Sequence, residues 1–124
     1  MPTIRVRNTL DGANPQTVFP LQGNQYEYLL FNARIEFAIT GTAATPADID
    51  AVTATVYSGS DILQQRGQIT NKSGVTGATT SAIYPDDFLL DDVAAAGERL
   101  SVELNLPAGA AGDTVDTVVK ITPL

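Results

Sequence analysis

The chain has 124 residues, of which 44 % are hydrophobic and 17 % charged, and this indicates one globular domain with its own core. It contains no histidine and no cysteine, so the side chains that most often act as general base or nucleophile are missing. The net charge is −7 and the seven basic residues are scattered, which disfavours nucleic acid and anionic membranes as partners. We therefore expect a single non-enzymatic domain over residues 1–124, without a cofactor.

The N-terminal part predicts short strands separated by turns. Residues 3–7 alternate apolar and charged side chains and predict a first strand. Residues 17–21 are predicted to pair back onto it as an edge strand or strand end, because Pro20 cannot donate to a sheet. Residues 26–31 are apolar at both odd and even positions, which predicts a buried strand or a strand with a bulge.

Alternation of apolar and polar side chains continues through the rest of the chain. It predicts strands at residues 34–40, 51–57, 62–69, 99–106 and 115–122. Between the first two, Thr45 and Pro46 suit the cap and the first position of one short helical turn.

Residues 85–97 are the main helical candidate. Asp86 is predicted to be the N-cap, Gly97 is the expected stop, and the apolar residues between them have nearly helical spacing. The stretch is short, so we expect one or two turns near residues 86–96.

The predicted elements amount to about eight or nine short strands at roughly 8–12-residue spacing, which is typical of a β-sandwich or barrel. We predict an all-β fold, a single Ig-like or jelly-roll-like sandwich of antiparallel strands. Residues 1–21 are either an N-terminal arm that adds to a partner's sheet or an edge hairpin of the chain's own sandwich.

The densest charge feature is an acidic group made of Asp86, Asp87, Asp91 and Asp92. Calcium takes several oxygen ligands from one short loop, but the spacing here differs from the EF-hand pattern and no glycine lies inside the group. A helix cap and a solvated helix face explain the same residues. We therefore predict no metal site.

Four glutamates are candidates for the carboxylate pair of a glycosidase: Glu27, Glu36, Glu98 and Glu103. Two of them, Glu36 and Glu103, lie at outward positions of alternating strands, where a charge simply belongs to the polar face. A serine–lysine arrangement would need Lys72 or Lys120, and both are predicted to be surface lysines of a turn and a strand. No catalytic residue is predicted.

Three aromatic residues, Tyr26, Tyr28 and Phe31, could form a ligand platform, although packing in the core or at an edge is the more common outcome at strand spacing. The chain has no tryptophan, which disfavours a sugar-binding cleft. A carbohydrate- or ligand-binding sandwich remains an alternative.

A distinctive order of elements runs over residues 33–106. An alternating strand (RIEFAI, residues 34–39) leads into a loop of Thr, Ala, Pro and Asp, followed by a second strand (VTATVY, residues 52–57) and a polar hairpin. A strand rich in Gly and Thr, an acidic turn (PDDFLL, residues 85–90) and the strand RLSVEL (residues 99–104) complete it. This order resembles β-sandwich modules of tailed-phage virions, namely capsid decoration or cement proteins and the Ig-like N-terminal domain of upper-baseplate proteins.

The resemblance implies a structural virion protein that decorates or stabilises a phage capsid through many protein–protein contacts. Its partners would be capsid or other virion proteins, and a homo-oligomer such as a trimer would suit a three-fold position. A tail or baseplate connector is the alternative, but the chain departs from the baseplate pattern in its extra N-terminal segment and single domain. The start Met1-Pro2-Thr3 shows no secretory signal, so we expect synthesis in the host cytoplasm and location in the virion.

Overall fold

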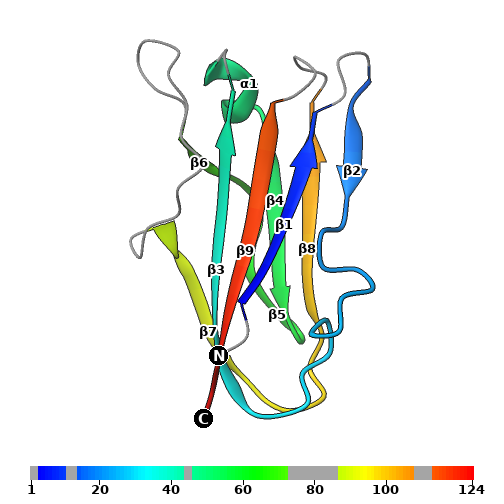
Figure 1. Ribbon diagram of the computed structural model, residues 1–124, viewed down its shortest axis with the longest axis vertical. Coiled ribbons are helices and arrows are strands. Elements are labelled where there is room, and N and C mark those ends of the chain that lie inside the picture. Colours follow the sequence, from blue (N-terminus) through cyan, green and yellow to red (C-terminus); the bar gives the residue numbers. More distant parts are fainter. Residues whose placement is uncertain (1–2, 11–13, 44–45, 73–86, 108–112) are drawn as a thin grey trace.

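Two β-sheets packed face to face form the protein in the computed structural model (Figure 1). The structure describes residues 3–10, 14–43, 46–72, 87–107 and 113–124. The predicted all-β sandwich is confirmed, because the described residues form nine strands and only one short α-helix.

The first sheet has the strand order β1-β9-β3-β6, and β7 also pairs with β3. Its strands are β1 (Thr3–Thr9), β3 (Ala33–Thr42), β6 (Thr70–Asn71), β7 (Leu90–Ala94) and β9 (Thr114–Pro123). β3 and β9 form its centre, since they pair antiparallel along their whole length, from Ala33 with Pro123 to Thr42 with Thr114.

The second sheet has the order β2-β8-β4-β5. Its strands are β2 (Gln16–Val18), β4 (Thr53–Ser58), β5 (Asp61–Gln68) and β8 (Leu100–Leu106). The edge strand β5 is irregular, because its register with β4 shifts and Arg66 adopts a φ of 46°. Such bulges at an edge hinder pairing with another chain.

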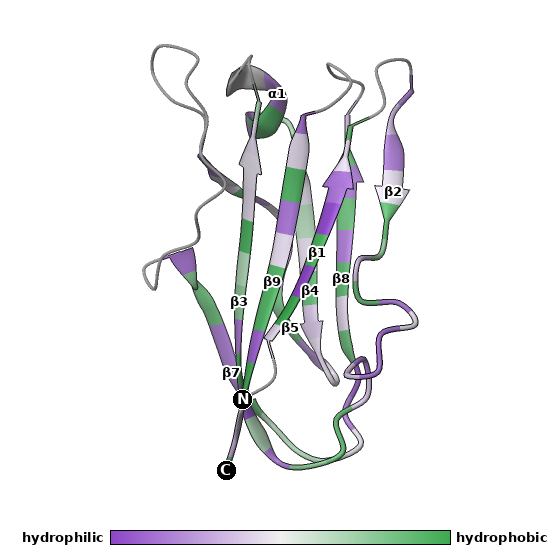
Figure 2. Cartoon of the chain, viewed as in Figure 1, coloured by the Kyte–Doolittle hydropathy of each residue, from purple (hydrophilic) through white to green (hydrophobic). Residues whose placement is uncertain are grey.

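The core lies between the sheets and follows the predicted alternation. β8 is the clearest case: Leu100, Val102, Leu104 and Leu106 are buried, and the polar residues between them face outward. Figure 2 shows the same alternation as changing colour along β8 and β9. Most of the predicted inward residues of the middle strands, from Ile35 and Phe37 to Val52 and Val56, are also buried.

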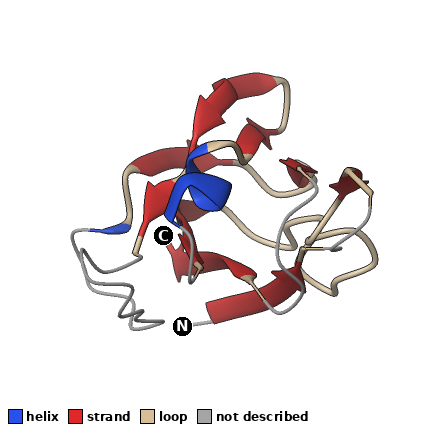
Figure 3. Ribbon diagram, turned by 90° about the horizontal axis from the view of Figure 1, so that it is seen from above, coloured by secondary structure: helices blue, strands red, loops and turns tan. Residues whose placement is uncertain are grey.

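The predicted short helical turn is confirmed as α1 (Pro46–Asp50), while its expected cap, Thr45, lies outside the described residues. α1 lies at the end of the sandwich opposite the end of β9 (Figure 1), and in the view from above it lies over the strands (Figure 3). Its Ile49 is fully buried and approaches β3 at Gly41. A Cβ atom at Gly41 would lie 2.7 Å from Cγ2 and 2.9 Å from Cδ1 of Ile49.

Gly41→Ala is expected to lower the free energy of unfolding by about 1–3 kcal/mol, because the added methyl group forces Ile49 and α1 away from β3. Urea denaturation measures the loss. In a double-mutant cycle, Ile49→Ala should make Gly41→Ala much less costly, since it removes the two clashing atoms. Equal costs in both backgrounds would contradict this account.

The two N-terminal strands belong to different sheets. β1 pairs with β9 and β2 pairs with β8, so the prediction that residues 17–21 pair back onto the first strand is wrong. β1 and β2 therefore lie in different layers, and Pro20 lies in a turn after β2. Of the two alternatives for residues 1–21, the structure shows their described part within the chain's own sandwich, without a hairpin.

On the outer face of the first sheet, an ion-pair network links β1 to β9. Arg5 Nη2 lies 2.9 Å from Asp116 Oδ2, and Arg7 Nε donates to Asp116 Oδ1 at 2.8 Å. The Asp116 side chain is only 4 % exposed, whereas both arginines are half exposed. Burial raises the pKa of the Asp116 carboxyl, but the hydrogen bonds from Arg7 and Arg5 outweigh it and the pKa lies below its usual value of 3.8.

Asp116→Ala is expected to lower the free energy of unfolding by about 2 kcal/mol at pH 7, because it removes the charged hydrogen bonds that Arg5 and Arg7 donate to this carboxylate. A carboxyl group whose pKa is lowered by folding stabilises the protein at pH values above its pKa in the unfolded chain. This stabilisation is lost as the pH falls through the folded pKa. The wild type should therefore lose more stability than Asp116→Ala between pH 7 and pH 3 in urea titrations. Asp61→Asn, which alters an exposed carboxylate, is the control, and parallel pH curves for wild type and Asp116→Ala would contradict the assignment.

The helical turn predicted near residues 86–96 is found only at Asp87, which lies in a 3₁₀ turn, and is wrong for residues 90–94. These form the strand β7, which pairs antiparallel with residues 33–37 of β3. Leu90, Asp92 and Ala94 point inward, with Asp91 and Val93 outward. The edge of β3 offers a hydrogen-bonding partner that a local helical spacing cannot reveal, and tertiary pairing overrides weak helix propensity. The expected cap Asp86 and the Gly/Thr-rich strand at residues 75–84 lie outside the described residues.

Residues 26–31 form turns with a single bridge between Tyr28 and Arg99, so the strand predicted there is also wrong. The segment is nevertheless anchored, because Leu29 is 2 % exposed and its N–H donates to the Glu98 carbonyl at 3.0 Å. A buried leucine among exposed neighbours explains why both parities of this stretch are apolar.

Candidate functional site

The acidic residues predicted as a possible group do not meet at one place. Asp87 forms an ion pair with Lys72, Asp91 lies 3.2 Å from Arg34 on the outer face of the first sheet, and Asp92 points inward. Asp86 lies outside the described residues. Across the ranges that the structure describes, no group of three His, Cys, Asp or Glu side chains could hold a metal ion.

The glutamates do not form a glycosidase pair either. Glu36 points outward from the first sheet and Glu103 outward from the second, so the two carboxylates lie on opposite sides of the sandwich. Glu27 is bound to Arg99, and Glu98 lies close to Gly59, where an added Cβ would be 2.8 Å from its carboxyl group. General acid and nucleophile must flank one bond, which this arrangement does not allow for Glu36 and Glu103.

The three aromatics predicted as a platform are also separated by burial. Tyr26 and Phe31 pack against the core, whereas Tyr28 is 55 % exposed. The Arg99 guanidinium lies 6.0 Å from the Tyr28 ring centre, the distance of a cation–π contact. Of the three aromatic residues, Tyr28 is therefore the one accessible to a partner, and Arg99 lies beside it.

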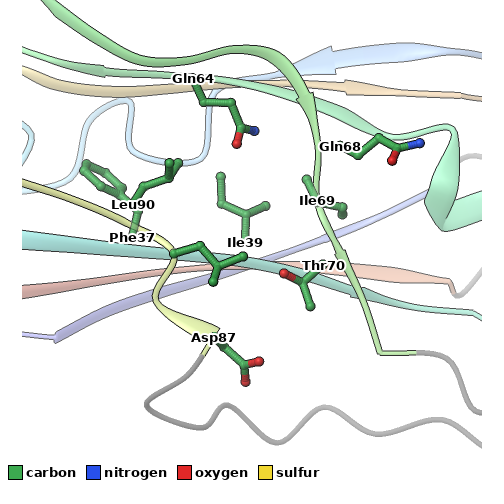
Figure 4. A pocket seen from close by; sticks show the side chains of 9 residues that line it. Phe37, Ile39, Gln64, Gln68, Ile69, Thr70, Asp87 and Leu90 are labelled. Atoms are coloured by element: carbon green, nitrogen blue, oxygen red, sulfur yellow. The ribbon is translucent and has the colours of Figure 1, made fainter.

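A small cavity lies between the sheets at their open side, where β5 faces β3 and β7. Figure 4 shows Gln64 and Gln68 on one side and the apolar side chains of Phe37, Ile39 and Leu90 on the other. Its volume of about 20 Å³ corresponds to a single water molecule, so it cannot admit a substrate.

A nearly buried ion pair borders that cavity. Lys72 Nζ lies 2.6 Å from Asp87 Oδ2, and the two side chains are 14 % and 10 % exposed. Lys72 is also fixed by its N–H, which donates to the Gly41 carbonyl at 2.8 Å. The pair links β6 to the residues that precede β7, and Lys72 is therefore structural rather than a free surface base.

Lys72→Ala and Asp87→Ala are each expected to destabilise the fold, because each leaves the opposite charge buried without its ion pair. In a double-mutant cycle followed by urea denaturation, the coupling should be about 1–3 kcal/mol. The same cycle on the exposed pair Arg34 and Asp91 should give less than about 1 kcal/mol. Similar coupling in both cycles would refute the burial argument.

The most developed polar constellation surrounds Arg99, at the start of β8. Its Nε and Nη2 both donate to Glu27 Oε2, at 3.0 and 2.9 Å, and its ring contact is Tyr28. The hydrogen bond from Arg99 and a second one from the Gly23 N–H lower the pKa of Glu27. Glu27 and Arg99 are therefore both charged near neutral pH. Arg99 is thus held in one orientation on the surface.

Beside Arg99 lies a surface hollow of about 270 Å³, which we call the Arg99 hollow. Tyr57, Gly59, Arg99 and Ser101 line it. Tyr57 and Ser101 are opposite each other in the pairing of β4 with β8 and both point outward from the second sheet. Gly59 forms the turn between β4 and β5 with a φ of 61°, as a type II′ turn requires.

A second hollow of about 290 Å³, the Asn105 hollow, lies at the other end of the same face. Its lining includes Thr17, Asn105 and Pro107. Thr17 Oγ1 and Asn105 Oδ1 lie 3.2 Å apart, on the adjacent strands β2 and β8. Neither hollow was predicted from the sequence, because alternation shows which residues face outward and not which strands are neighbours.

Exposed apolar side chains gather at the end of the sandwich where β3 begins and β9 ends. Leu30 is 80 % exposed and Val93 63 %, and Leu124 is exposed as well. The Leu124 N–H donates to the carbonyl of Asn32, which follows Leu30 by two residues. Val93 of β7 pairs with Arg34 of the neighbouring strand β3. We call Leu30, Val93 and Leu124 the basal apolar surface.

No protein-family model matches the sequence, and no curated protein or solved structure matches it. No helix in the described part of the chain has the length and apolar character needed to cross a bilayer. The chain's own surfaces are therefore the basis for inferring its function.

Proposed function

We propose that the protein is a non-enzymatic structural protein of a phage virion, and that it decorates or stabilises the capsid through many protein–protein contacts. The observation that carries the proposal is the basal apolar surface, where three large apolar side chains are exposed at one end of the sandwich. Exposed apolar groups that cluster in this way mark sites of protein–protein contact. The order of elements over residues 33–106, which resembles virion modules, supports the same assignment.

The arrangement of charged residues favours a binding role over a catalytic one. Asp116, Asp87 and Glu27 are tied to arginines or a lysine, and Glu36 and Glu103 lie on opposite outer faces of the sandwich. A catalytic pair of carboxylates needs a shared pocket, and the cavity between the sheets has a volume of about 20 Å³. A virion protein that acts through its surfaces needs no such pocket.

The location of the protein is the direct test. Particles from the source should be purified, heads separated from tails, and both fractions probed with an antibody against the chain. We expect a strong signal in the heads at high copy number, because decoration acts through many copies. A signal in the tails alone would replace this role with that of a tail or baseplate connector, and absence from both fractions would refute a virion role.

Leu30→Asp and Val93→Asp should weaken binding to particles that lack the native protein by at least about tenfold, since each places a charge in an apolar contact. Co-sedimentation of purified protein with such particles measures the binding. Leu89→Asp is the matched control, because Leu89 is similarly exposed but lies before β7, farther from the basal apolar surface. Circular dichroism checks that all three variants fold, and equal binding by all of them would exclude this surface.

A further inference from the structure

The outer faces of the two sheets differ in charge. The first carries Arg5, Arg7, Arg34, Lys120, Glu36, Asp91 and Asp116. On the second, the outward residues that pair in register are Thr, Ser, Asn, Gln, Tyr and Ile side chains and Glu103, and the exposed Arg66 lies in the bulge of β5 beside Thr55. A face with few charges and many neutral hydrogen-bonding groups suits a neutral ligand with many hydroxyl groups.

The Arg99 hollow offers three polar groups that have no partner among the described residues. They are Nη1 of Arg99 and the hydroxyl groups of Tyr57 and Ser101. Because Arg99 already pairs with Glu27 through Nε and Nη2, the site has hydrogen-bond donors but no unbalanced positive charge. Vicinal hydroxyl groups of a sugar can accept from the guanidinium and donate to the phenol oxygen, so they satisfy both kinds of group.

The Asn105 hollow repeats this chemistry with apolar walls. The contact between Thr17 and Asn105 leaves the Asn105 amide nitrogen as a donor, and Pro15, Pro107 and Ala51 supply carbon surfaces on which a sugar ring can rest. Both volumes lie just below the roughly 300–1,000 Å³ of pockets for drug-sized ligands. Each hollow is therefore of a size for a single ring rather than for a large molecule.

The two hollows are aligned along one strand. Ser101 and Asn105 both point outward from β8 and are four residues apart, which corresponds to about 13 Å along the strand. Between them lie Glu103 and Thr55, which are opposite each other on β8 and β4. Glu103 would repel an anionic chain on this path, whereas its oxygens can accept from hydroxyl groups.

We propose that the outer face of the second sheet binds a neutral oligosaccharide along β8, with one sugar ring in the Arg99 hollow and another in the Asn105 hollow. This site shares no residue with the basal apolar surface and does not depend on a virion role.

The test is a titration of ¹⁵N-labelled full-length protein with cellohexaose, maltohexaose and chitohexaose, followed by amide chemical shifts. At least one of these should shift the amides of Tyr57, Ser101 and Asn105, while those of the first sheet stay in place. Tyr57→Ala should weaken the binding by about tenfold or more, because it removes both a ring and a hydroxyl group. Asn105→Ala should weaken binding of the hexasaccharide but not of the matching disaccharide, which fills one hollow.

Thr122→Ala on the outer face of the first sheet is the matched control and should leave the affinity unchanged. Circular dichroism establishes that each variant is folded, so a lost interaction is not lost structure. The proposal is overturned if none of the three sugars shifts the second sheet, or if Tyr57→Ala binds as well as the wild type.

Discussion

The antiparallel pairing of β3 with β9 runs the length of the first sheet, and the other strands of that sheet attach to one or the other of these two. β1 attaches to β9, whereas β6 and β7 share the free edge of β3. The inward side chains of the pair, from Ile35 and Phe37 to Val119 and Ile121, are buried against the second sheet. Burial of apolar area is the main favourable term in folding, so the side chains of this central pair stabilise the sandwich.

The predictable part of the fold follows from this constraint. Where one face of a strand is buried and the other is wet, side chains must alternate, and the sequence alone then locates β3, β4, β8 and β9. What alternation does not contain is the identity of the neighbour. The crossing of the chain between β1 and β2, and the pairing of Leu90–Ala94 with β3, depend on tertiary hydrogen bonds that leave no local signal.

The candidate sites were less predictable for the same reason. Arg99 and Glu27 are separated by 72 residues, and they meet because the Leu100 N–H donates to the Glu27 carbonyl at 2.7 Å. Tyr57 and Ser101 become neighbours through the register of β4 with β8. The sequence does indicate which side chains face outward, and it identifies Tyr28 as a candidate ligand-binding residue. The lack of tryptophan argued against a sugar site, but it could not show that a tyrosine and an ordered arginine share one hollow.

One anchored segment positions both proposed surfaces. Glu27 orients Arg99 toward the second sheet, and Leu30, three residues later, belongs to the basal apolar surface. Between them Leu29 is buried, and its backbone both donates to the Glu98 carbonyl and accepts from the Gly97 N–H at 2.7 Å. Exposed residues on either side of such an anchor lose little further conformational entropy when a partner binds, because the backbone is already ordered. The turn at residues 26–31 thus gives a binding surface more rigidity than a loop of its length would have without the anchor.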